Sequence, residues 1–131
     1  MRILFGLIIL SLFSSFSFAD TIRQTIPANK SSAVGLHGTY GPECESGVTP
    51  QIKVTKEPEN GSVSFQQINT KLSEKAGRCA GRPVKGTVVV YKPNRGFRGK
   101  DVFRIRFTMD MYDYGSAKIR NVAHKYVIEV K

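Results

Sequence analysis

The chain has 131 residues, and its 20 Lys and Arg against 10 Asp and Glu give a formal net charge of +10. A length near that of one average domain excludes a second domain. Two cysteines and two histidines, spread along the sequence without a C-x-x-C motif, argue against a zinc centre or a redox pair.

Residues 1–19 have the layout of a secretory signal peptide. Arg2 precedes an apolar run at residues 3–12, and small residues stand three and one positions before a cut after Ala19. A membrane-spanning helix needs about 20 apolar residues, whereas serines interrupt the second half of this stretch. We therefore expect cleavage after Ala19 and an exported domain over residues 20–131, periplasmic or extracellular, with no transmembrane segment left after cleavage.

Only one intramolecular disulfide is possible, between Cys44 and Cys79. Disulfides form and persist in the oxidising compartments outside the cytoplasm, so export favours this pairing. Closing a loop of this size stabilises a fold by roughly 3 to 4 kcal/mol in the chain-entropy model. A metal pair is disfavoured, because only His37 and His124 could complete the ligand set.

The first clear strand signal is the alternation of polar and apolar residues at 51–56. Residues 57–61 (EPENG) end this segment, and Asn-Gly is among the strongest tight-turn signals. Val63 and Phe65 then alternate with polar residues. We expect a hairpin in which this second segment returns along the first.

The next segment, residues 68–83, is polar, contains two glycines and holds Cys79. We expect a long loop here, with a turn of helix near residues 72–75. The β-branched run at residues 87–91 is the strongest strand signal in the chain, and Pro-Asn-Arg-Gly at 93–96 ends it.

From Asp101 the alternation returns, with one apolar and one basic face. The apolar face consists of Phe103, Ile105, Phe107 and Met109, and the basic face contains Arg104 and Arg106. A turn at residues 113–116 leads into a final strand in which Tyr126, Ile128 and Val130 share one face. Short strands separated by turn signals predict an all-β sandwich.

Residues 89–105, VVYKPNRGFRGKDVFRI, resemble the Y-x-P-x-x-G-F-x-G-x-D-x-F-x-Y signature of bacterial immunoglobulin-like and cadherin-like repeats. Residues 57–65 similarly resemble the segment that precedes it. The resemblance, which covers residues 40–131, implies an immunoglobulin-like antiparallel β-sandwich in the form of a small stand-alone exported protein. Ile105 replaces the usual tyrosine, and an insertion holds Cys79. These departures weaken any transfer of adhesion or calcium binding.

The resemblance also implies a structural corner between two core strands. Its members are Tyr91, Pro93, Gly96, Phe97, Gly99, Asp101 and Phe103. Gly96 and Gly99 can adopt backbone angles that are costly for other residues, and Asp101 can accept backbone N–H groups across the turn. We interpret Asp101 as a structural cap and not as a catalytic acid.

The excess of cations is concentrated in one third of the domain. Residues 71–106 contain 11 Lys and Arg against two acids, whereas the rest of the mature chain is balanced. Strand pleating places alternate residues on opposite faces, and arginine suits phosphate because its planar group donates two parallel hydrogen bonds. We expect an anion-binding patch formed by Arg95, Arg98, Lys100, Arg104 and Arg106.

The leading hypothesis is a non-enzymatic binding module for an anionic envelope component, such as lipopolysaccharide, anionic lipid or acidic polysaccharide. Two alternatives stay open. The basic surface could serve solubility alone. The domain could instead bind a periplasmic protein, as an accessory subunit or inhibitor, through strand edges or the Cys79 loop.

Enzymatic activity is disfavoured, because the sequence contains no G-x-S-x-G, no H-E-x-x-H and no glycine-rich phosphate loop. No motif indicates a cofactor or a specific nucleic acid. We expect His37 in a loop and His124 at the edge of the last strand. Asp110 and Asp113 are too few carboxylates for a calcium site.

Overall fold

The computed structural model describes the backbone of residues 20–113 and 116–131, and the side chains of those outside residues 109–120. The described part forms seven strands and one short 3-10 helix. These are β1 (Asp20–Ile26), β2 (Ser32–Gly38), β3 (Lys53–Lys56), β4 (Gly61–Lys71), η1 (Glu74–Cys79), β5 (Pro83–Pro93), β6 (Gly99–Asp113) and β7 (Ser116–Val130). The expected signal peptide at residues 1–19 lies outside the described residues.

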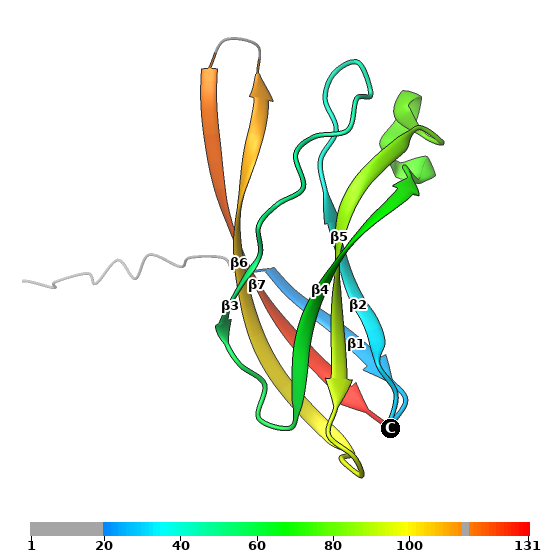
Figure 1. Cartoon of the computed structure of the whole chain (residues 1–131), viewed down its shortest axis with the longest axis vertical. Coiled ribbons are helices and arrows are strands. Elements are labelled where there is room, and N and C mark those ends of the chain that lie inside the picture. Colours follow the sequence, from blue (N-terminus) through cyan, green and yellow to red (C-terminus); the bar gives the residue numbers. More distant parts are fainter. Residues whose placement is uncertain (1–19, 114–115) are drawn as a thin grey trace, which may run out of the picture.

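Two sheets pack face to face as an immunoglobulin-like β-sandwich (Figure 1). One sheet has four strands in the order β1-β7-β6-β3, and the other has three in the order β2-β5-β4. The Cys44–Cys79 disulfide is present. The predicted fold class is therefore confirmed, with one difference: β1 pairs parallel to β7, so the sandwich is not wholly antiparallel.

The expected hairpin between residues 51–56 and the following strand is wrong. β3 pairs with β6, where Val54 lies opposite Ile105, whereas β4 pairs with β5 in the other sheet. Residues 57–60 therefore cross from one sheet to the other. Asn60-Gly61 does form a bend, but the bend does not close a hairpin. The carbonyl of Asn60 accepts a hydrogen bond from Asn94 N–H at 2.8 Å, which ties the bend to the β5–β6 connection.

The expected long loop at residues 68–83 is shorter in the structure. β4 continues to Lys71 and stays in register with β5 up to Pro83, so the connection covers only residues 72–82. The helical turn lies at residues 74–79 instead of 72–75. An edge strand tolerates polar side chains on both faces, which is why the polar sequence concealed the end of β4.

Two strands near the start, β1 and β2, carry no clear alternation in the sequence. In β2 a bulge at Val34 interrupts the register with β5, so that Val34 and Gly35 both face inward. His37 belongs to β2 and not to a loop, and His124 lies within β7 and not at its edge. Both corrections bring polar rings between the sheets.

Inward-facing residues of five strands form the core. They are Ile26, Val34, Val89, Tyr91, Phe103, Ile105, Phe107, Tyr126, Ile128 and Val130. The rings of Phe103 and Tyr126 stack with centroids 4.7 Å apart, and the ring of Tyr91 lies 6.1 Å from that of Phe103. The predicted alternation in β6 is confirmed, since its aromatic and aliphatic residues are buried and its arginines exposed, while the side chain of Met109 lies outside the described residues.

Candidate functional site

The outward side of β6 displays the cations that the sequence singled out. Lys100, Arg104 and Arg106 are exposed and alternate with the buried Phe103 and Ile105. Successive side chains of a strand point to opposite faces, so these three cations share the outer face of the four-stranded sheet.

Neighbouring strands add further cations to this face. Residues directly opposite each other in an antiparallel pair point to the same side. Arg104 lies opposite Lys56 of β3 and Lys125 of β7, and Arg106 lies opposite Lys53 of β3. Arg23 of β1 lies opposite Val127, which in turn lies opposite Val102 on the same side. The basic face consists of Arg23, Lys53, Lys56, Lys100, Arg104, Arg106 and Lys125.

The centre of the basic face is compact. Lys56, Arg104 and Lys125 form one row across three strands, and Lys53 and Arg106 form a second row beside it. Strands lie about 4.8 Å apart and alternate residues about 6.7 Å apart, so five cations fall within a rectangle of roughly 10 by 7 Å. That size is comparable to the Debye length of about 8 Å at physiological salt, so the electrostatic potentials of the five cations overlap.

The basic face contains little compensating negative charge. Among the side chains that the structure describes, none of its seven cations lies within 4.0 Å of a carboxylate oxygen. Glu129 lies opposite Lys100 but is 4.0 Å from Lys131 Nζ. Like charges directly opposite each other destabilise a sheet, so this arrangement costs the free protein some stability that a bound anion would return.

The other sheet has a different outer face. Its central rows are Ala33, Val90 and Ser64, and Leu36, Val88 and Gln66, none of them charged. Leu36 is 52% exposed. The outer face of the four-stranded sheet therefore carries a cluster of cations, whereas the central rows of the three-stranded sheet carry none.

The structural corner fastens the two sheets through the buried side chain of Asp101. Its Oδ1 accepts hydrogen bonds from the backbone N–H groups of Glu59 (3.1 Å) and Val102 (2.9 Å). Its Oδ2 accepts from Asn60 N–H (3.0 Å) and from the hydroxyl of Tyr91 (2.7 Å). Burial first, and then the hydrogen bond to Asp101 and its charge, raise the pKa of Tyr91.

Backbone geometry completes the corner. Gly96 and Gly99 have φ angles of 82° and 125°, a region that favours glycine. The N–H of Gly96 donates to Oδ1 of Asn29 at 2.8 Å, which ties the corner to the β1–β2 connection. Arg95 lines a shallow hollow there with Lys92 and Asn29. The predicted patch is thus divided: Lys100, Arg104 and Arg106 share the basic face, whereas Arg95 and Arg98 belong to the corner.

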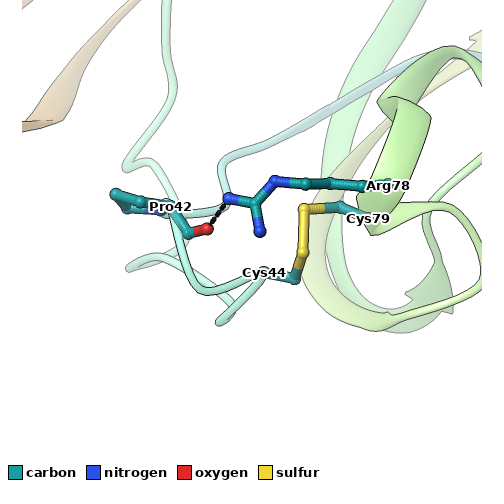
Figure 2. Close-up of a disulfide and its surroundings, with 4 residues drawn as sticks. All are labelled: Pro42, Cys44, Arg78 and Cys79. Atoms are coloured by element: carbon teal, nitrogen blue, oxygen red, sulfur yellow. Dashed lines mark hydrogen bonds between the residues drawn. A yellow bond between two sulfur atoms is a disulfide. The ribbon is translucent and has the colours of Figure 1, made fainter.

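The opposite end of the sandwich is held by the disulfide. Cys44, in the β2–β3 connection, is bonded to Cys79 at the end of η1, with 5.3 Å between their Cα atoms. Figure 2 shows the guanidinium of Arg78 beside this bond, where it donates a hydrogen bond to the carbonyl of Pro42. The other cations of residues 71–85 belong to this end of the molecule, so the basic third of the sequence does not form one patch.

A cluster of four rings joins β2 to the four-stranded sheet. Nε2 of His37 and the hydroxyl of Tyr126 are hydrogen-bonded at 2.8 Å, and the ring of His37 stacks on that of His124 with centroids 5.1 Å apart. Phe107 packs against both histidines. A Cβ at position 35 would lie 2.1 Å from the Tyr126 hydroxyl, so only glycine there lets Tyr126 reach His37.

Burial shifts the pKa of two members of this cluster, His37 and Tyr126. Burial, and then the neighbouring His124, lower the pKa of His37 to about 4. Burial raises the pKa of Tyr126 to about 12. Nδ1 of His124 is buried and has no hydrogen-bond partner within the described part of the chain, with Asp20 Oδ2 3.9 Å away. The cluster joins β2 to β7, and the lowered pKa of His37 predicts that this contact weakens in acid.

Four members of the basic face could not be predicted from the sequence: Arg23, Lys53, Lys56 and Lys125. Alternation within each strand was visible, but the pairing of β3 and β7 with β6 was not. The two histidines were likewise assigned to separate places, since they are far apart in the sequence.

Within the described residues, no group of three or more His, Cys, Asp or Glu side chains could hold a metal ion. The side chains of Asp110 and Asp113, considered for calcium, lie outside them. No helix of the described chain is long and apolar enough to cross a membrane. Comparisons with protein-family models, with curated proteins and with solved structures found no match to this chain.

Proposed function

We propose that the protein is an exported, non-enzymatic module that binds an anionic envelope component through the basic face. The observation that supports this most is the grouping of five cations from β3, β6 and β7 in two adjacent rows, without a described carboxylate partner. Several cations held on a rigid sheet favour an extended polyanion, because each additional ionic contact adds to the same binding event.

The chemistry of the site favours phosphate or carboxylate groups that repeat along a ligand. Arg104 and Arg106 can each donate paired hydrogen bonds to one anionic group, while the lysines act as point charges around them. Lipopolysaccharide phosphates, anionic lipid head groups and acidic polysaccharides are the polyanions of this kind in a bacterial envelope.

Two sequence features support the compartment and the class. The signal-like residues 1–19 support export, and the resemblance of residues 89–105 to bacterial immunoglobulin-like and cadherin-like repeats supports a bacterial surface or periplasmic setting. In this proposal the buried Asp101 is a structural residue of the corner, and neither histidine takes part in binding.

Retention on immobilised lipopolysaccharide or heparin tests the proposal. A variant with Lys53, Lys56, Arg104 and Arg106 all changed to Thr should elute at much lower salt than the wild type. The matched control changes Lys30, Lys75, Arg82 and Lys85 to Thr. These four are also exposed, so the control loses the same net charge elsewhere.

A local binding site predicts that the control elutes close to the wild type. Equal loss of retention in both variants would show that only net charge matters, and the basic surface would then serve solubility. Thermal unfolding of each variant verifies that the domain is folded.

A second function, binding of a periplasmic protein through a strand edge or the Cys79 loop, is favoured by a different observation. β4 is a long edge strand with a single charge. Recovery of one defined partner protein in salt high enough to abolish polyanion binding would favour this alternative.

A further inference from the structure

The four edge strands of the described sandwich differ in how well they are protected against pairing with another chain. β3 has only four residues, a bulge and two lysines. β2 is interrupted by the bulge at Val34, and β1 has seven residues and carries Arg23. Short length, bulges and charges are the devices that keep sheet edges from pairing.

β4 has none of these devices. It runs for 11 residues in unbroken register with β5, and its only charged residue, Lys71, is the last. Apart from its ladder with β5, no hydrogen bond within the described residues involves the backbone of residues 61–71. The half-buried side chains of Val63, Phe65 and Ile68 leave apolar surface along the same edge.

We infer that the β4 edge pairs antiparallel with the β4 edge of a second copy of this chain, around a two-fold axis at Gln66. This register uses the whole strand, with Gln66 opposite Gln66 and Gly61 opposite Lys71 of the other copy. No two charges of the same sign face each other along the junction, because Lys71 is the only charged residue of β4 and lies opposite Gly61 of the other copy.

Charge complementarity at both ends of the junction favours a second copy over an unrelated strand. Glu59 is exposed and lies in the bend that immediately precedes β4, two residues before Gly61. Lys71 of the other copy lies opposite Gly61, so its flexible side chain can reach this carboxylate. The two-fold axis repeats the same contact at the opposite end.

The symmetry has a consequence for the basic face. An antiparallel pair within one continuous sheet is related by an axis perpendicular to that sheet, so each layer of one copy continues the same layer of the other. Both four-stranded sheets then present their basic faces in one direction. This consequence rests on the proposed function, and it makes the dimer a bivalent binder of an anionic surface or polymer.

Sedimentation velocity tests the pairing on the protein without any ligand. A strand junction of this size lies at the low end of stable interfaces, so we expect a dissociation constant on the order of 100 µM. Gln66→Lys places two like charges at the axis and should weaken the dimer more than tenfold, and Gln66→Glu should do the same. An equimolar mixture of the two variants should restore dimers.

The matched control is Ala33→Lys, which adds the same charge to an exposed position on the opposite edge of the same sheet and should leave dimerisation unchanged. A wild type that stays monomeric at about 1 mM, or a dimer insensitive to both Gln66 variants, would overturn the inference. Retention on heparin reports separately on the basic face. A monomer that is retained contradicts only the dimer, and a dimer that is not retained contradicts only the proposed function.

Discussion

The inner and outer sides of the four-stranded sheet are built from alternate residues of the same strands, yet they do different things. On β6 the inward residues Asp101, Phe103 and Ile105 join the two sheets, whereas the outward Arg104 and Arg106 face solvent among other cations. On the inner side, the apolar residues pack against the core and the carboxylate of Asp101 accepts hydrogen bonds from other residues of the fold. On the outer side, none of the seven cations of the basic face lies within 4.0 Å of a carboxylate oxygen among the described side chains. This difference separates a structural surface from a candidate binding surface.

The largest expected effect comes from the inner side. The carboxylate of Asp101 now accepts hydrogen bonds from three backbone N–H groups and one hydroxyl. Asp101→Asn would turn one of its acceptor oxygens into an amide NH₂ group that faces these donors. An unsatisfied buried group of this kind costs about 3 kcal/mol of the free energy of unfolding, a large share of a small domain's stability. Urea unfolding measures the loss. Glu43→Gln, at an exposed carboxylate, is the control and should change little.

A change on the outer side should affect anion binding and not stability. Replacing Arg104 and Arg106 with Thr should weaken heparin binding about tenfold at low salt, near 1.4 kcal/mol, and should reduce the slope of log affinity against log salt by about two. Stability should not fall, since both side chains are exposed. An unchanged salt slope measured by titration at several salt concentrations would contradict the role of the basic face.

The histidine cluster, on the inner side, predicts that the free energy of unfolding depends on pH. Unfolded His37 takes up a proton near its ordinary pKa of 6.5, whereas burial delays protonation in the folded state until about pH 4. In that window the unfolded state binds more protons, so the free energy of unfolding should fall as the pH is lowered. We expect a loss on the order of 1 to 2 kcal/mol after solvent screening.

His37→Gln is the test, because it keeps a polar group near the hydroxyl of Tyr126 but removes the titration. Urea midpoints measured between pH 7 and 4 should fall less steeply for this variant than for the wild type. Parallel curves would mean that other groups account for the acid sensitivity. Heparin binding per folded molecule should be the same for both at pH 7.

The smallest expected effect is a gain in stability when a negative charge is introduced on the outer side. Lys53→Glu would place a carboxylate opposite Arg106 and remove one repulsive pair. Cross-strand pairs of opposite charge contribute roughly 0.2 to 1 kcal/mol, so the variant should be slightly more stable and yet bind heparin more weakly. Thermal unfolding in low salt measures the gain. A loss of stability would argue that Lys53 already has a favourable partner.

The two outer faces of the sandwich extend this contrast. The four-stranded sheet carries the basic face, while the central rows of the three-stranded sheet are uncharged. In the proposed function the anion binds the basic face, and in the inferred dimer the second copy pairs with the edge of the other sheet, so the two proposals use different surfaces.

Several features could be predicted from the sequence because each depends on near neighbours in the chain. Period-two alternation identified the inward and outward residues of β6, the β-branched run identified β5, and two cysteines allowed a single disulfide. Glycine and proline spacing located the corner, since backbone angles there are a local property. These signals were enough for the sandwich class.

Tertiary structure decided what lies beside what. Pairing of β3 with β6, and not with β4, brought Lys53 and Lys56 to Arg104 and Arg106, and the bulge in β2 placed His37 on Tyr126 and His124. Strand pairing joins residues far apart in the sequence, and its register depends on the whole core and not on any one segment. Composition therefore determined that the protein is basic, whereas the sheet determined where its positive charge is concentrated.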